Sequence, residues 1–97
     1  MERAETLKRL SAHRAELHQQ FGVTSLAIFG STARDTATAA SDVDLLVEFD
    51  RPTGLFGLIR LQFYLEEILG CSVDVGTIEG LKPRIRDRVM AESIHVN

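Results

Sequence analysis

Two aspartates separated by one residue, Asp42 and Asp44, are the side chains of this sequence best suited to hold a metal ion. They stand at the start of an apolar segment, 43–49, with strand character, and alternate side chains leave the same face of a strand. Two carboxylates held so close repel one another unless a cation neutralises them. Oxygen ligands of this kind suit Mg²⁺, which usually binds one or two carboxylates together with substrate phosphates. An isolated Asp-x-Asp is more often a solvated strand edge, so the pair alone predicts little.

A Gly-Ser pair supplies the second feature of a phosphate site. Gly30 and Ser31 follow directly after the apolar segment 23–29. Backbone N–H groups at a helix start stabilise an anion, glycine lets a phosphate approach the backbone, and a serine hydroxyl can donate to it. Arg34 could reach a phosphate or pair with an acid, although an exposed helix arginine is the simpler alternative. A turn with Ser31 as helix cap would also explain the pair. Beside the two carboxylates, however, it predicts a metal–triphosphate site.

A third acid, Asp74, lies inside the apolar segment 71–75. An acid within a short strand is unfavourable by propensity and is costly to bury unpaired. If this strand lies beside that of Asp42 and Asp44, Asp74 can share a metal with them. Three acids and two ions, about 3.5–4 Å apart, would then stabilise an in-line phosphoryl displacement. A surface acid at a strand end remains the alternative.

The elements that must position these residues alternate between helical and extended periods. This alternation predicts an α/β (α+β) fold, with a small mixed sheet of three to four strands and helices packed on it. Gly22 and Gly70 each follow a segment in which apolar residues recur at helical spacing, and such glycines mark helix ends. We expect helices over 2–20, 55–69 and 83–91; strands over 23–29, 43–49, 71–75 and 93–96; one or two helical turns over 31–37; and a polar connection over 36–41.

Length and composition limit the possible classes of protein. The 97 residues make one small domain, 1–97, and the 44% hydrophobic and 26% charged content excludes a disordered or collagen-like chain. A net charge of −3 argues against direct nucleic-acid binding. No apolar run approaches the roughly 20 residues of a membrane span, and the charged start lacks a signal-peptide core. The single cysteine excludes an internal disulfide, so we expect a cytoplasmic protein.

Two further segments leave alternatives open. The basic residues of segment 82–88 could contact a nucleotide tail, RNA or an acidic partner, but a solvated helix surface is the simpler interpretation. The segment 55–69 carries more apolar side chains than one helix face needs, which suggests an interface, with core packing as the default. The residues concerned are Leu55, Phe56, Phe63 and Tyr64.

The combined pattern resembles a known family. Gly30-Ser31, ten intervening residues, Asp42-x-Asp44 and a later strand Asp74 are similar to the nucleotidyltransferase superfamily of DNA polymerase beta, and to its minimal stand-alone members in particular. The similarity covers essentially the whole chain. It implies that the Gly-Ser segment holds a nucleoside triphosphate and that Asp42 and Asp44 bind two Mg²⁺ ions. Asp74 would complete the site as a metal ligand or as the base that activates an acceptor hydroxyl.

The resemblance also implies a function. Minimal members of this family are often antitoxins encoded beside a helical HEPN-type RNase toxin, and some transfer AMP from ATP to a tyrosine of the toxin. We therefore expect an enzyme that uses Mg²⁺ and ATP to modify a HEPN-type partner protein, since so small a chain lacks a second domain to hold an acceptor. The alternatives are an antitoxin that neutralises by binding alone and a small-molecule adenylyltransferase subunit. Two residues depart from the family pattern: Thr32 stands where many relatives have Arg, and Asp35 where many have Gly.

Overall fold

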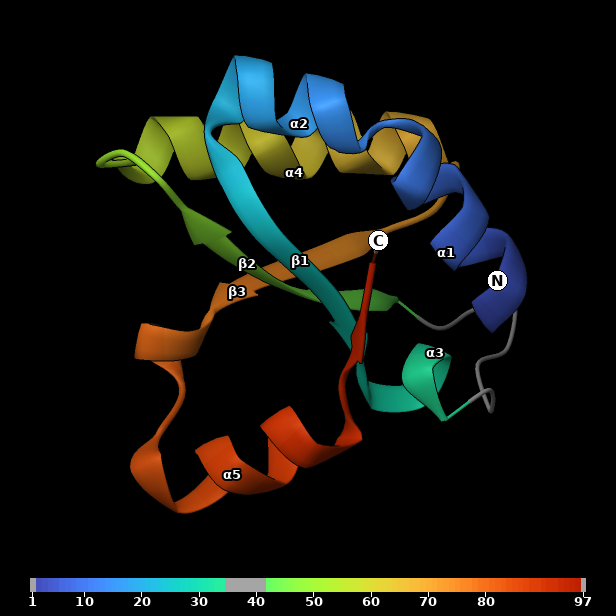
Figure 1. Cartoon of the computed structure of the whole chain (residues 1–97), viewed down its shortest axis with the longest axis vertical. Coiled ribbons are helices and arrows are strands. Elements are labelled where there is room, and N and C mark those ends of the chain that lie inside the picture. Colours follow the sequence, from blue (N-terminus) through green and yellow to red (C-terminus); the bar gives the residue numbers. More distant parts are fainter. Residues whose placement is uncertain (1, 35–41, 97) are drawn as a thin grey trace.

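Four strands form one mixed sheet in the order β3-β2-β1-β4 (Figure 1). The computed structural model describes residues 2–34 and 42–96. The central strand β2 pairs antiparallel with β1 and parallel with β3, while β4 pairs antiparallel with β1. The predicted α/β class with a small mixed sheet is therefore confirmed. The strands are β1 (Val23–Phe29), β2 (Val43–Phe49), β3 (Val73–Thr77) and β4 (Ile94–His95).

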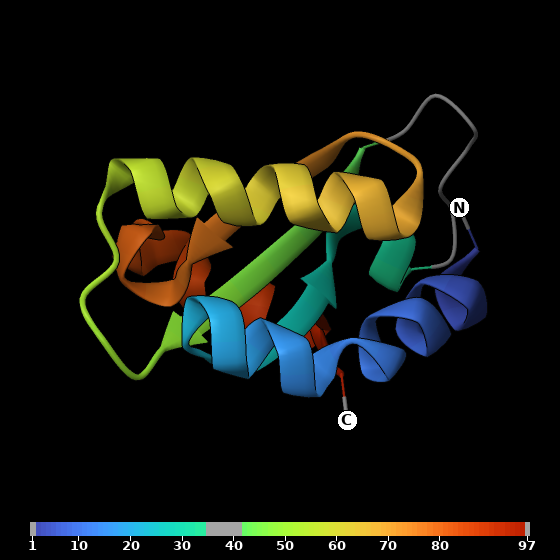
Figure 2. The same cartoon turned by 90° about the horizontal axis from the view of Figure 1, so that it is seen from above.

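Helices lie on both faces of this sheet. α1 (Arg3–Ala12), α2 (Arg14–Phe21) and α4 (Leu55–Leu69) cover one face, with α4 running beside the other two (Figure 2). α5 (Pro83–Glu92) lies on the opposite side, below the sheet in Figure 1. The short α3 (Gly30–Ala33) follows β1 directly, and the 3₁₀ helix η1 (Ile78–Gly80) follows β3. In the part of the chain that the structure describes, no helix is both long and apolar enough to cross a bilayer.

The hydrophobic core lies between the sheet and the three helices α1, α2 and α4. Alternate side chains of β2, namely Val43, Leu45 and Val47, are buried there, as the alternating pattern predicts. The other set of β2 side chains, which includes Asp44, leaves the opposite face, the side on which α5 lies. From α4, the core receives Leu61, Leu65 and Leu69.

The predicted single helix over 2–20 is wrong, because the chain divides it at His13. The His13 ring nitrogen Nδ1 contacts the Arg9 carbonyl oxygen at 2.9 Å, and the His13 backbone N–H donates to Leu10 instead. A side chain that occupies an i−4 carbonyl interrupts the helical ladder at that point. Periodicity alone does not show this competition.

The third strand begins two residues later than predicted. Cys71 and Ser72 make the turn from α4: the Ser72 carbonyl accepts a hydrogen bond from Val43 N–H at 3.0 Å, and the Glu66 carboxylate accepts one from Val73 N–H at 3.0 Å. The strand then continues to Thr77, which pairs with Val47. The remaining bounds follow the predictions closely, except that α3 ends at Ala33 and the rest of the predicted turns and connection, 35–41, lies outside the described residues.

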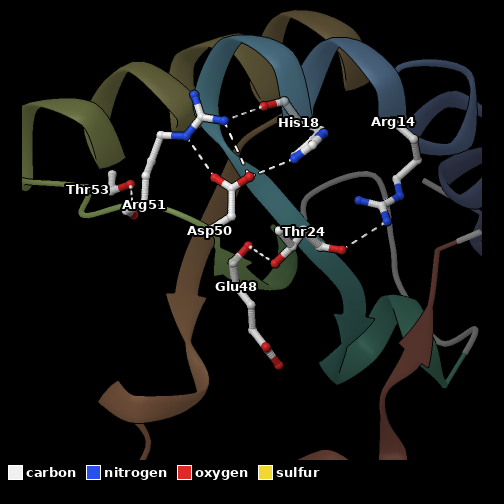
Figure 3. A network of polar contacts seen from close by, with 7 residues as sticks. All are labelled: Arg14, His18, Thr24, Glu48, Asp50, Arg51 and Thr53. Atoms are coloured by element: carbon white, nitrogen blue, oxygen red, sulfur yellow. Dashed lines mark hydrogen bonds and ion pairs between the residues drawn. The ribbon is translucent and has the colours of Figure 1, made fainter.

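A polar network joins α2 to the start of the β2–α4 connection (Figure 3). The Asp50 carboxylate accepts hydrogen bonds from Arg51 Nε and from His18 Nε2, both at 2.7 Å. These two partners, Arg51 first, lower the pKa of Asp50 to about 2. Gly22, in the left-handed conformation at φ 77°, accepts a backbone hydrogen bond from Asp50, and a side chain there would overlap Arg51 and Asp50. These contacts tie α2 and the end of β1 nearest it to the chain that leaves β2.

The core predicts a clear contrast between two residues of α4. Leu61→Ala removes a fully buried side chain and should lower the free energy of unfolding by about 2–5 kcal/mol. Phe63→Ala, its matched control, removes a side chain that is 65% exposed and should change stability by less than about 1 kcal/mol. Urea denaturation followed by circular dichroism measures both; equal losses would contradict the described packing of α4.

Candidate active site

The pairing of β2 with β3 brings two of the predicted acids together. Asp44 and Asp74 are direct partners in the parallel register, so their side chains leave the same face of the sheet. On its other side, Asp44 is paired with Phe29, the last residue of β1. The condition set out from the sequence, that the strand of Asp74 lies beside that of Asp44, is therefore met.

Gly30 closes the site on the β1 side. It has a φ of 68°, and a Cβ atom built there would overlap the Asp44 carboxylate oxygen Oδ2. Both the backbone conformation and the close approach therefore require glycine at this position. The Gly-Ser segment and the Asp-x-Asp segment, ten residues apart in sequence, are in contact in space.

Like charges gather around Asp44. Its carboxyl is half-buried, and burial raises its pKa; the neighbouring charges of Asp74 and then Asp42 raise it further, while Arg34 opposes them. Asp42 and Asp74 are both exposed. The three acids thus share one electrostatic environment, in which ionisation of the central carboxyl is disfavoured unless a cation lies nearby.

α3 brings the remaining predicted residues to this end of the sheet. Ser31 follows Gly30 in the first turn and is half-buried. Arg34, at the end of α3, is exposed, and its Nη1 lies 3.5 Å from Glu92 Oε2 on α5. The Arg3 side chain donates to the Ala33 carbonyl at 3.2 Å, which ties α3 to α1 as well. α3 is thus held between two helices at the acidic end of the sheet.

The residues present suit a magnesium ion bound together with a substrate. Within residues 2–34 and 42–96, no group of three His, Cys, Asp or Glu side chains is arranged to hold a metal ion. Mg²⁺, however, is usually held by one or two carboxylates with the rest of its ligands from water and substrate phosphates. The repulsion of Asp44 by Asp74 and Asp42, and the close approach of Gly30 to the Asp44 carboxylate, suit such an ion. Of the two departures from the family pattern, Thr32 is buried, and Asp35 lies outside the described residues.

Glu92 is a residue near the site that sequence reasoning did not single out. It lies 58 residues from Arg34 along the chain, and nothing local in the sequence connects the two. A weak signal exists in the i, i+4 spacing of Arg88 and Glu92, which predicts an ion pair on a helix. That spacing says nothing about the contact with α3.

A mixed sheet with acids gathered at one end suits a protein that transfers phosphoryl or nucleotidyl groups, and comparison with known proteins identifies the family. Residues 10–96 match the model of the nucleotidyltransferase domain. The chain is 41% identical over 87 residues to protein adenylyltransferase MntA of Thermococcus cleftensis, covering 90% of this chain and 88% of that protein. The chain belongs to the nucleotidyltransferase domain family and is a nucleotidyltransferase enzyme homologous to MntA.

Solved structures agree with this assignment. A candidate minimal nucleotidyltransferase superposes with a TM-score of 0.81 at 38% identity, covering 97% of this chain and 95% of that one. The complex of a tri-AMPylated Shewanella oneidensis HEPN toxin with its MNT antitoxin contains a chain that matches with a TM-score of 0.66 at 14% identity, covering 94% of this chain and 71% of that one. The second likeness shows a shared fold.

The charge cluster predicts that Asp44 destabilises the metal-free domain. Because its pKa is raised on folding, the folded state binds this proton more tightly, and stability falls as pH rises through the folded pKa. At pH 7 without divalent ions, Asp44→Asn should therefore raise the melting temperature by a few degrees. The gain should vanish below the ordinary aspartate pKa of 3.8. Addition of Mg²⁺ should raise the melting temperature of the wild type but not of the variant.

Scanning calorimetry with EDTA or Mg²⁺ measures these shifts. Glu48→Gln is the matched control, since Glu48 is an exposed acid on the same strand and the same face. An Asp44→Asn variant that melts at or below the temperature of this control in EDTA would contradict the described electrostatics.

Proposed function

We propose that this chain transfers AMP from Mg-ATP to a protein acceptor, a HEPN-type toxin, and thereby acts as its antitoxin. The observation that carries the proposal is the parallel register of Asp44 and Asp74 beside Gly30. It places the Asp44 carboxylate against Gly30 and beside Asp74, an arrangement that suits nucleotidyl transfer. The homology to an enzyme named protein adenylyltransferase supports AMP as the transferred group.

Each site residue has a role in this proposal. Asp42 and Asp44 hold Mg²⁺, and Gly30, Ser31 and Arg34 hold the triphosphate. When bound, the metal neutralises phosphate charge and acts as a Lewis acid. The glycine lets the phosphates approach the backbone, and the arginine adds a cation with several donors in a fixed plane.

The transfer itself requires little more from the protein than positioning. The acceptor oxygen bonds to the α-phosphorus of ATP, the bond from that phosphorus to the bridging oxygen breaks, and pyrophosphate leaves. The proton of the acceptor hydroxyl passes to the Asp74 carboxylate, which is exposed and therefore accessible. Most of the catalysis in such reactions comes from orientation and charge stabilisation, which a small domain can provide.

An exposed apolar surface on α4 supports a protein partner. Leu55 is 70% exposed, Phe56 80% and Phe63 65%, and Ile59 joins them on the same side of the helix. We call these four residues the α4 surface. Large apolar side chains gathered on one exposed face commonly mark a protein interaction site. The HEPN toxin as the occupant is inferred from the toxin–antitoxin complexes that share this fold.

The catalytic part of the proposal is tested by AMP transfer. The chain is incubated with Mg²⁺, labelled ATP and the HEPN-type protein encoded beside it, and the partner is measured by intact mass. Wild type should add AMP, and Asp44→Ala should reduce the rate by on the order of 10³-fold, because a metal ligand is lost. Glu48→Gln, on the same face of β2, should transfer at the wild-type rate.

Two outcomes would separate the alternatives. If wild type and Asp44→Ala neutralise the partner equally with no AMP added, the protein is a binding antitoxin. AMP found on a small molecule in place of the partner would instead identify an adenylyltransferase subunit with a different acceptor.

The docking part of the proposal is tested separately. Phe56→Ser combined with Phe63→Ser should weaken binding of the HEPN-type partner at least about tenfold, because buried aromatic anchors dominate interface energies. Ile85→Ser, which removes an exposed apolar side chain from α5, is the matched control and should leave affinity unchanged. Calorimetric titration measures the affinity, and equal binding by both variants would exclude the α4 surface as the interface.

A further inference from the structure

The last helix, α5, lies at the surface of the domain. None of its residues is buried, and Ile85 and Met90 are each 40% exposed. Its C-terminal end comes near α3, on the side of the domain where the acids gather (Figure 1). Its apolar side chains are thus only partly covered, so polar contacts with the rest of the domain also bear on its position.

Glu92, at the end of α5, makes the contact with α3. Its Oε2 lies 3.5 Å from Arg34 Nη1, and its Oε1 lies 3.6 Å from Arg88 Nε. Each oxygen of the Glu92 carboxylate thus lies near one arginine. The contact uses Nη1 of Arg34, and a guanidinium group carries donors on two further nitrogens.

Arg34 lies between two sources of negative charge. The acids of the sheet attract it, as its effect on Asp44 shows, while Glu92 attracts it from the side of α5. An exposed arginine side chain loses rotamer entropy when it is fixed in one geometry. A second anchor on another helix reduces this loss upon ligand binding.

We propose that Glu92 is a positioning residue that holds the Arg34 guanidinium beside the acidic site, so that its other donors can bind the triphosphate. The inference rests on the proposed function, because it requires Mg-ATP to bind at Asp42, Asp44 and Arg34. It gives α5 a function in nucleotide affinity, although no residue of this helix is assigned to the reaction.

A double-mutant cycle tests the proposal. Binding of Mg-ATP to the full chain, without partner protein, is measured by calorimetry for wild type, Glu92→Gln, Arg34→Ala and the double variant. Exposed ion pairs contribute about 0.2–1 kcal/mol, so Glu92→Gln should raise the dissociation constant about 1.4- to fivefold. In the Arg34→Ala background the same change should have no effect, because Glu92 acts through Arg34. In AMP transfer, Glu92→Gln should raise KM for ATP and leave kcat unchanged.

Asp87→Asn is the matched control, since it removes one exposed negative charge from the same helix. If Glu92→Gln and Asp87→Asn bind Mg-ATP equally, or if Glu92→Gln has the same effect with and without Arg34, the positioning role is overturned while nucleotide binding by the acids stands. If the wild type itself fails to bind Mg-ATP, both the proposed function and this inference fall.

Discussion

The parallel pairing of β2 with β3 is the constraint on which the rest of the structure depends. It sets Asp44 opposite Asp74, and it requires the crossover through α4, because parallel strands cannot be joined by a tight turn. On its other edge β2 is paired with β1, and Gly30, which follows β1, therefore lies against the Asp44 carboxylate. The repulsion between the acids is opposed by the buried face of β2, where alternate side chains form the core. A slip of one residue would exchange the two faces, burying the acids and exposing the core residues.

The residues of the candidate site could be singled out from the sequence because their patterns are local. Asp42-x-Asp44 and Gly30-Ser31 are recognisable by residue type and spacing, and the bounds of β2 and α4 follow from alternation and from the glycine after the helix. Asp74 is different. Its place beside Asp44 depends on which strands are neighbours, and a single sequence supplies no such information. The sequence therefore predicts Asp74 as a site residue only on the condition that the two strands are neighbours, or through the family resemblance.

The parts that the sequence did not predict share a physical cause: they depend on individual polar contacts. The interruption at His13 comes from one ring nitrogen on one carbonyl, and the delayed start of β3 from the turn residues that connect α4 to the sheet. The contact of Glu92 with Arg34 joins residues 58 positions apart. Periodicity averages over a whole element and therefore detects cores and faces well, but it does not register individual hydrogen bonds.

The first residues of the α4 surface and the acids lie towards opposite ends of β2. α4 begins where β2 ends and returns to the start of β3, so Leu55 and Phe56 are separated from Asp44 by roughly the length of β2, about 20 Å for its seven residues. A protein anchored on Leu55 and Phe56 must therefore reach the acids with a different segment from the one that anchors it. The anchor then acts as a tether, which raises the effective concentration of any acceptor side chain on a flexible segment of suitable length. Selectivity for the acceptor would depend on tether length as well as on the chemistry of the acidic site.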